Sequence, residues 1–162
     1  MKKITLILVS FLFFACKAQE KTAFSKEVLA APMVSLSGDD LTFQQLIDNQ
    51  QGKITVIEVW ASWCSDCIKG LPKLKKLQEK HPNANYVFIS LDKNQTDWKK
   101  GINRFSIKGD HYYVEGGWKS IFAKNIDLDW IPRYIVIDET GKVLIYRAIE
   151  ADDSRITNVL EN

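Results

Sequence analysis

Trp60-Ala61-Ser62-Trp63-Cys64-Ser65-Asp66-Cys67 connects two segments of different periodicity in a chain of 162 residues. The segment before it, residues 53–60, is apolar at nearly every position, which is typical of a central strand covered on both faces. The segment after it carries Leu71, Leu74 and Leu77, the spacing of a helix with one buried face. The sequence therefore places two cysteines, three residues apart, where a strand passes into a helix.

The spacing of Cys64 and Cys67 suits a disulfide that opens and closes. Residues i and i+3 of a helix have Cβ atoms roughly 5–6 Å apart, so a small rotation brings them within disulfide range. Closing a loop of about four residues stabilises a fold by roughly 2 kcal/mol, which is little for a structural disulfide. Cys64 begins the first helical turn, where free N–H groups and the helix dipole favour a thiolate. We therefore predict that Cys64 is the nucleophile and that Cys67, further into the helix, is the resolving cysteine.

Ser65 and Asp66 separate the two cysteines and are predicted to tune their redox potential. Asp66 repels a neighbouring thiolate, but a carboxylate is also favourable at a helix N-terminus, and the sequence leaves open which effect is larger. Two other interpretations are half of a zinc site and a pair of inert thiols. A structural zinc site needs four ligands, and no further thiol lies nearby, while His81 and His111 are isolated from each other. We expect no metal and no cofactor.

The stretch from Trp60 to Cys67 resembles the active-site sequence of thioredoxin-like proteins, and in particular of the TlpA/ResA group of extracytoplasmic thiol-disulfide oxidoreductases. The resemblance covers about residues 31–147. It implies an α/β thioredoxin-like fold with a central mixed β-sheet flanked by helices, and an enzyme that exchanges disulfides with proteins. Pro72 matches a proline that these proteins carry five residues after the second cysteine. Asp66 is a departure, because thioredoxins and many relatives have proline there.

The resemblance also assigns a role to Glu58, which stands six residues before Cys64. Thioredoxins carry a buried carboxylate at this position. Burial raises the pKa of a carboxyl group toward neutrality, where it can pass protons. Glu58 is therefore predicted to accept the proton of Cys67 during resolution. The alternative is that the strand has one wet face and that Glu58 points to water.

Pro132 precedes a predicted strand and resembles the cis-proline that faces the cysteines in thioredoxin-like folds. The resemblance implies that the backbone of Ile131 pairs with an extended substrate segment, and that Trp130 and Trp63 shape the groove beside it. The alternative is an ordinary trans proline at the start of a strand. Arg133 stands where the family commonly has a small polar residue. It is predicted either to attract acidic partners or to reach solvent.

The remaining pattern predicts the other elements of the sheet and its helices. Besides the strand 53–60, strands are expected at 31–36, 86–91, 111–114, 133–138 and 142–147. Helices are expected at 41–47, 65–80, 96–105, 118–123 and 155–160, with Thr96 capping the third.

The N-terminus has the form of an exported lipoprotein. Residues 1–15 combine a basic start with an apolar run too short to span a bilayer comfortably, which is typical of a signal peptide. Their end resembles a bacterial lipoprotein cleavage site with Cys16 as the lipid-bearing residue. The alternative is an ordinary signal peptide cut nearby. Residues 16–30 are predicted to be a tether, and residues 31–162 a single thioredoxin-like domain.

Export predicts a membrane-anchored lipoprotein of the cell envelope that faces the periplasm or another extracytoplasmic side, where disulfides persist. Removing Lys2 and Lys3 leaves 20 basic and 20 acidic residues, so no nucleic-acid partner is indicated. The resemblance implies disulfide-containing protein substrates and a membrane thiol electron carrier that re-reduces the cysteine pair. We favour the direction of reduction. A disulfide oxidase or isomerase, and a peptide-binding module without redox turnover, are the alternatives.

Overall fold

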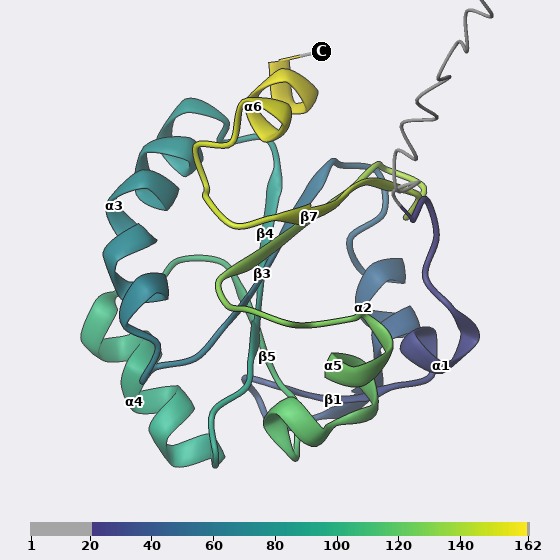
Figure 1. Cartoon of the computed structure of the whole chain (residues 1–162), viewed down its shortest axis with the longest axis vertical. Helices are drawn as coiled ribbons and strands as arrows, with labels where there is room; N and C mark the ends of the chain where they lie inside the picture. The colour runs from purple at the N-terminus through teal and green to yellow at the C-terminus, as the bar shows by residue number, and fades with distance from the viewer. Residues whose placement is uncertain (1–20, 162) are drawn as a thin grey trace, which may run out of the picture.

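A seven-stranded sheet in the order β2-β1-β5-β4-β3-β6-β7 forms the centre of the computed structural model, which describes residues 21–161 (Figure 1). Strand β3 lies parallel to β4 and antiparallel to β6, so the sheet is mixed, as predicted. The strands are β1 (Pro32–Ser35), β2 (Asp40–Thr42), β3 (Thr55–Trp60), β4 (Asn85–Ser90), β5 (Asp110–Tyr113), β6 (Arg133–Ile137) and β7 (Val143–Ala148).

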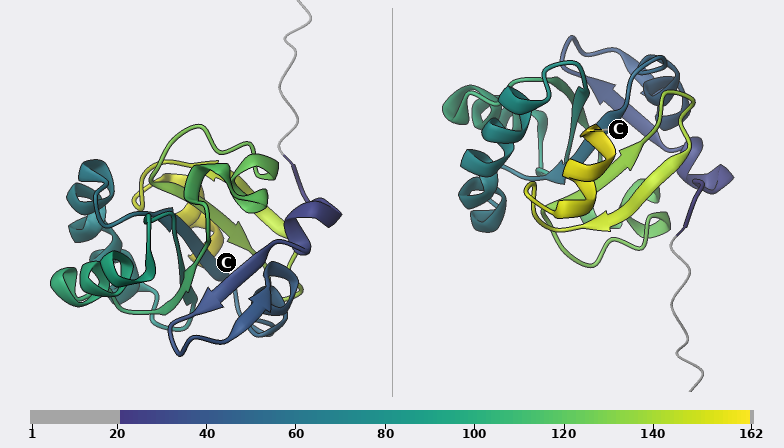
Figure 2. Two further views of the ribbon diagram at one scale, coloured as in Figure 1. Left: turned by 90° about the horizontal axis from the view of Figure 1, so that it is seen from below. Right: turned by 90° about the horizontal axis from the view of Figure 1, so that it is seen from above.

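Helices cover both faces of this sheet (Figures 1 and 2). They are α1 (Lys26–Leu29), α2 (Phe43–Asp48), α3 (Ser65–Lys80), α4 (Gln95–Phe105), the short 3₁₀ helix η1 (Gly117–Lys119), α5 (Ile121–Asn125) and α6 (Ser154–Glu161). The crossovers β3–α3–β4 and β4–α4–β5 step across the sheet in the same direction, so their right-handedness puts α3 and α4 on one face. Helices α1, α2 and α5 lie on the other face.

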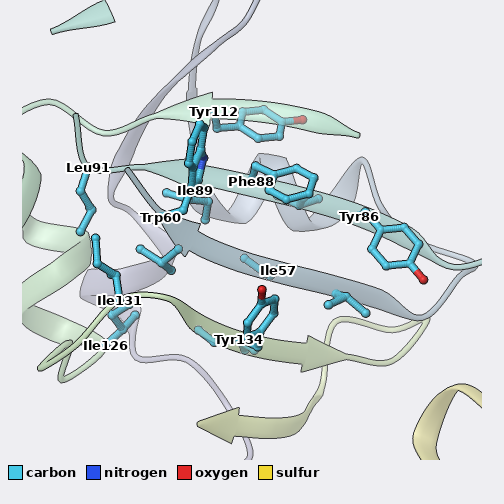
Figure 3. Close-up of a cluster of buried hydrophobic side chains, with 14 of the residues drawn as sticks. Ile57, Trp60, Tyr86, Phe88, Ile89, Leu91, Tyr112, Ile126, Ile131 and Tyr134 are labelled. Atoms are coloured by element: carbon cyan, nitrogen blue, oxygen red, sulfur yellow. The ribbon is translucent and has the colours of Figure 1, made fainter. Parts of the chain in front are cut away.

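Strand β3 is buried at every position because both faces of the sheet are covered there. Its register places Glu58 between Phe88 of β4 and Tyr134 of β6. Figure 3 shows the buried side chains that surround β3, including Trp60 and Tyr134. This packing fixes the carboxyl end of β3, from which the active-site helix α3 follows.

Three helix starts differ from the prediction. The predicted helix 41–47 begins only at Phe43, because Leu41 and Thr42 belong to β2 and Thr42 caps α2. Helix α4 is capped by Asn94, whose side-chain oxygen accepts the N–H of Asp97 at 2.9 Å, rather than by Thr96. The predicted helix 118–123 is two helices, because Ser120 has extended backbone angles and caps α5 by accepting the N–H of Ala123. Propensity alone does not reveal such breaks, since a capping serine is also tolerated inside a helix.

The segment just before residue 31 also differs from the prediction, because it packs on the sheet instead of forming a free tether. Phe24 lies edge-on to Phe43, with ring centroids 4.9 Å apart, and Val28 of α1 is fully buried. The carbonyl of Thr22 accepts the N–H of Val143 at 3.2 Å. The packed chain therefore begins by Thr22. The predicted signal peptide 1–15 and Cys16 lie outside the described residues.

Between residues 21 and 161, the chain has no helix with the length and apolar character needed to cross a membrane.

Candidate active site

Cys64 and Cys67 form a disulfide at the point where β3 passes into α3. Their Cα atoms are 5.3 Å apart, and Cys64 is 6% exposed while Cys67 is 1% exposed. An incoming sulfur can therefore reach Cys64 more readily than Cys67. This difference supports the predicted order of attack, with Cys64 first and Cys67 second.

Cys64 is the N-cap of α3, and its sulfur accepts the backbone N–H of Cys67 at 3.1 Å. A cap residue satisfies an N–H group that has no partner within the helix. After reduction, the same N–H and the positive end of the helix dipole favour a thiolate at Cys64. The local structure thus supplies part of the activation that a nucleophilic thiol needs.

The peptide bond between Ile131 and Pro132 is cis, as predicted. The carbonyl oxygen of Ile131 lies 3.6 Å from the sulfur of Cys64, so the loop before β6 directly faces the disulfide. Between them is a groove of about 340 Å³, which we call the cysteine groove. Its lining residues are Trp63, Cys64, Ser65, Asp66, Trp118, Asp129, Trp130 and Ile131.

The cysteine groove combines aromatic walls with acidic side chains. Trp63 and Trp130 are exposed, while the side chain of Ile131 is buried, which leaves the Ile131 backbone as its contribution to the groove. The charged residues of the lining are Asp66 and Asp129. Asp66 is also exposed and lies 3.5 Å from Lys69 in an i,i+3 ion pair. Residues 21–161 contain no group of three or more His, Cys, Asp or Glu side chains that could hold a metal.

Glu58 is buried, with 2% of its surface exposed, so the alternative of a wet strand face is wrong. Burial raises the pKa of Glu58 to about 8, and a hydrogen bond with the hydroxyl of Tyr134 partly offsets this effect. The hydroxyl of Tyr134 points toward α3, because a Cβ atom added to Gly70 of that helix would lie 4.0 Å from it. Glu58 is thus on the α3 side of the sheet, and Gly70 is one turn along α3 from Cys67.

With this geometry in place, the comparisons with known proteins give the family. A family model described as thioredoxin-like matches residues 52–143, more than half of the chain. The chain belongs to the thioredoxin-like family.

Among the relatives of this thioredoxin-like protein, the thiol-disulfide oxidoreductase ResA of Bacillus thuringiensis (strain Al Hakam) is 28% identical over 134 residues. These residues are 82% of this chain and 72% of the relative. The solved thiol-disulfide oxidoreductase of Bacteroides fragilis NCTC 9343 is 25% identical with a TM-score of 0.64, over 82% of this chain and 97% of its own. The thioredoxin domain of a thiol-disulfide oxidoreductase from Bacteroides vulgatus is 20% identical with a TM-score of 0.69, over 88% and 97%, and supports the fold.

Asp92 is a site residue of this thioredoxin-like protein that the sequence analysis missed. It is buried, and its carboxylate accepts the backbone N–H of Ser62 at 3.0 Å, the hydroxyl of Ser62 at 2.6 Å and the hydroxyl of Ser90 at 2.8 Å. Asp92 thereby holds the loop that presents Trp63 and Cys64. The signal that would have found it is an acidic residue just after a buried parallel strand, where active-site loops gather.

Arg133 differs from both predictions made for it, because it neither reaches solvent nor offers itself to an acidic partner. It is 1% exposed and forms an ion pair with Asp129, which also lies 3.3 Å from Arg147. Burial lowers the pKa of Arg133, Arg147 lowers it further, and Asp129 opposes both. Two nitrogens of its guanidinium have no hydrogen-bond partner among the described residues. Through its ion pair with Asp129, the buried Arg133 therefore anchors the loop that carries Trp130 and Ile131.

The raised pKa of Glu58 predicts a pH-dependent stability that the Glu58→Gln variant lacks. Because the folded state binds this proton more tightly than the unfolded chain, the stabilisation is complete below the unfolded pKa and is lost as pH rises through about 8. Unfolding of the oxidised protein by urea at pH 6 and pH 9 should therefore show a fall on the order of 3 kcal/mol in the wild type. We expect Glu58→Gln to remove most of this fall.

Glu79→Gln is the matched control, because Glu79 is an exposed carboxylate on α3. It should keep the wild-type dependence on pH. If Glu58 also accepts the proton of Cys67, Glu58→Gln should slow the resolving step about 10²-fold, a typical contribution of a general base. A Glu58→Gln variant that loses stability with pH as the wild type does would contradict the assignment of the buried charge.

Proposed function

We propose that this protein reduces protein disulfides outside the cytoplasm as a membrane-anchored thiol-disulfide oxidoreductase. The observation that carries the proposal is the Cys64–Cys67 disulfide at the start of α3, whose more exposed sulfur faces Ile131 across the cysteine groove. The kinship with ResA supports the same chemistry. Trp63, Trp130 and the Ile131 backbone bind the extended substrate segment.

The reaction transfers two electrons in two exchange steps. The Cys64 thiolate attacks one sulfur of the substrate disulfide, so that a Cys64–substrate disulfide forms and the other substrate sulfur leaves as a thiolate. Cys67 then gives its proton to the Glu58 carboxylate and attacks the Cys64 sulfur. This attack forms the Cys64–Cys67 disulfide, the state seen here, and releases the second substrate thiolate. One substrate thiolate takes the proton held on Glu58 and the other takes a proton from solvent, so the substrate ends as a dithiol.

The charge of the cysteine groove supports reduction as the direction. A couple is strongly oxidising when its reduced form is stabilised, which requires a favourable environment for the thiolate. The N–H of Cys67 contributes such stabilisation. The charged side chains that line the groove itself, Asp66 and Asp129, are both acidic, and their ion pairs with Lys69, Arg133 and Arg147 reduce but do not remove their opposition to a thiolate at Cys64. Asp66, between the two cysteines, in this way shifts the couple toward release of its electrons.

The protein is anchored to a membrane outside the cytoplasm, and its cysteine pair is reduced again there. Residues 1–15 act as a lipoprotein signal peptide, and Cys16 carries the lipid that anchors the chain to a membrane of the cell envelope, facing the periplasm or another extracytoplasmic side. A short tether joins this anchor to the packed domain. Disulfides persist in that compartment, so a reductant needs an outside source of electrons. A membrane-embedded thiol carrier supplies them by reducing the Cys64–Cys67 disulfide.

The reduction potential of the Cys64–Cys67 couple tests the direction. The purified full-length chain is equilibrated with glutathione or dithiothreitol buffers, and its thiols are counted after acid quenching. We expect a value near or below roughly −250 mV, in the range of thioredoxin. A value between roughly −120 and −180 mV is that of oxidants and isomerases and would overturn the direction.

A further inference from the structure

A second groove, of about 670 Å³, adjoins the active site on the side away from the cis-proline loop. We call it the basic groove. Its walls are α4 on one side and the loop before Cys64 on the other. Its lining residues are Ser62, Trp63, Asp92, Lys93, Asp97, Lys100, Gly101, Arg104 and Phe105. Trp63 lines both grooves, so a chain bound across Cys64 that continues past this ring enters the basic groove.

Three cations line the basic groove, and none is in an ion pair within residues 21–161. Lys100 and Arg104 are four residues apart and share one face of α4, while Lys93 lies in the loop before α4. Of the two acidic residues of the lining, Asp92 is buried and accepts hydrogen bonds from Ser62 and Ser90. The carboxylate of the other, Asp97, accepts a hydrogen bond from the side chain of Asn94 at 2.8 Å.

The opposite flank of the active site does not have this free positive charge. There a groove runs beside Pro132 and Trp130 and includes Lys69 and Lys73. Lys69 is paired with Asp66, and Lys73 with both Glu150 and Asp152 at 2.5 and 3.2 Å. The cations on that flank are already neutralised by carboxylates of the same chain. Among the described residues that line these two flanking grooves, the cations without an ion-pair partner therefore lie on the α4 side.

Helix α4, which carries two of the three cations of the basic groove, is tightly packed against the rest of the domain. A Cβ on Gly101 would lie 2.5 Å from the Cβ of Ser62, so α4 packs against the active-site loop as closely as a glycine allows. Trp98 anchors the buried face of α4, with its ring 5.7 Å from that of Tyr113. The backbone that carries Lys100 and Arg104 is therefore fixed relative to the loop that presents Cys64, which keeps the two cations beside the active site.

We propose that the basic groove binds an acidic, extended segment next to the disulfide of the substrate protein. The inference rests on the proposed function and adds a substrate class to it. Charge complementarity selects acidic residues, and Trp63 supplies apolar surface for the side chains between them, while the Phe105 ring lies 5.2 Å from the guanidinium of Arg104. Complementary charge of this kind raises the rate of encounter and selects among partners.

Single-turnover kinetics of the full-length protein in non-ionic detergent test this proposal. The reduced protein is mixed with disulfide peptides whose flanking residues are either glutamate or its neutral isostere glutamine, placed on the N-terminal or the C-terminal side. Tryptophan fluorescence follows the oxidation of Cys64 and Cys67. At low salt we expect one of the glutamate peptides to react about tenfold faster than its glutamine counterpart. This advantage should largely vanish in about 1 M salt.

Two double variants, each of which replaces two cations by two glutamates, distinguish an effect of the basic groove from an effect of the overall electrostatic field of the protein. Lys100→Glu/Arg104→Glu should abolish the preference for the glutamate peptide. Lys53→Glu/Lys142→Glu is the matched control, because these exposed lysines flank the starts of β3 and β7. The control should retain the preference.

Equal rates for glutamate and glutamine peptides in the wild type would overturn the proposal, as would an equal loss of preference in both double variants. Neither result touches the proposed function, because the glutamine peptides are still reduced in both cases. Failure of the proposed function is a different result, in which the reduced wild type reacts with none of the peptides.

Discussion

Cells that produce the Cys67→Ser variant should accumulate covalent complexes between this protein and its substrates. Serine cannot attack the Cys64–substrate disulfide, so the first exchange step is completed and the second is blocked. Catalytic reduction of a protein disulfide should fall by at least about 10³-fold, since the two cysteines act as a unit. The complexes are detected on non-reducing gels after acid quenching, and they should be recovered with the membrane fraction if Cys16 anchors the chain.

The double variant Cys64→Ser/Cys67→Ser is the control for this experiment. It should form no such complexes, because Cys64 supplies the only attacking thiolate of the mechanism. Complexes that persist in the double variant would assign the bond to another cysteine, such as an unmodified Cys16. A Cys67→Ser variant that forms no complexes, while its partners still bind when Cys64 is also replaced, would indicate a peptide-binding module.

The Asp129→Asn variant should be destabilised by about 2–3 kcal/mol. Arg133 is 1% exposed, and Asp129 is its ion-pair partner among the described residues, so the change leaves a buried guanidinium charge without compensation. Removing one member of a fully buried pair costs about 3–5 kcal/mol. We expect less here because Asp129 is 61% exposed and water already reaches its carboxylate. Urea unfolding of the oxidised protein at pH 7 measures the loss.

Two further variants make this prediction specific to the buried charge. Asp127→Asn removes a carboxylate of the same loop whose ion pair with Lys21 is exposed on both sides, and it should cost about 1 kcal/mol or less. Asp129→Asn/Arg133→Met replaces the pair by an apolar side chain and should recover most of the lost stability. If Asp129→Asn costs no more than Asp127→Asn, the Arg133 charge is not compensated by Asp129.

The elements around the cysteines could be predicted because their signals are local. The apolar run before Trp60 indicates a buried strand, and the leucine spacing after Cys67 indicates a helix. The predicted helix 65–80 has the bounds of α3. Backbone hydrogen bonding and the period of a helix act over a few residues, so a short segment is enough to reveal them. The resemblance to thioredoxin-like proteins added the cis bond at Pro132, which no local pattern distinguishes from a trans bond.

The surroundings of single charged residues were decided only by the tertiary structure. Arg133 was expected in solvent or at a partner, but it lies beneath the loop that carries Trp130, and Asp92 was not singled out at all. Phe24 and Val28 looked like parts of a polar tether until Phe43 and the sheet supplied a surface for them.

The sequence by itself determined the strand-to-helix junction, the cysteine pair and its order along the helix, because these depend on neighbours within one or two turns. The tertiary structure alone decided which charges are buried, which are neutralised and which remain free beside Cys64. The reason is physical: desolvation and Coulomb interaction depend on segments far apart in the chain, such as α4 and the active-site loop, and on what they exclude from water.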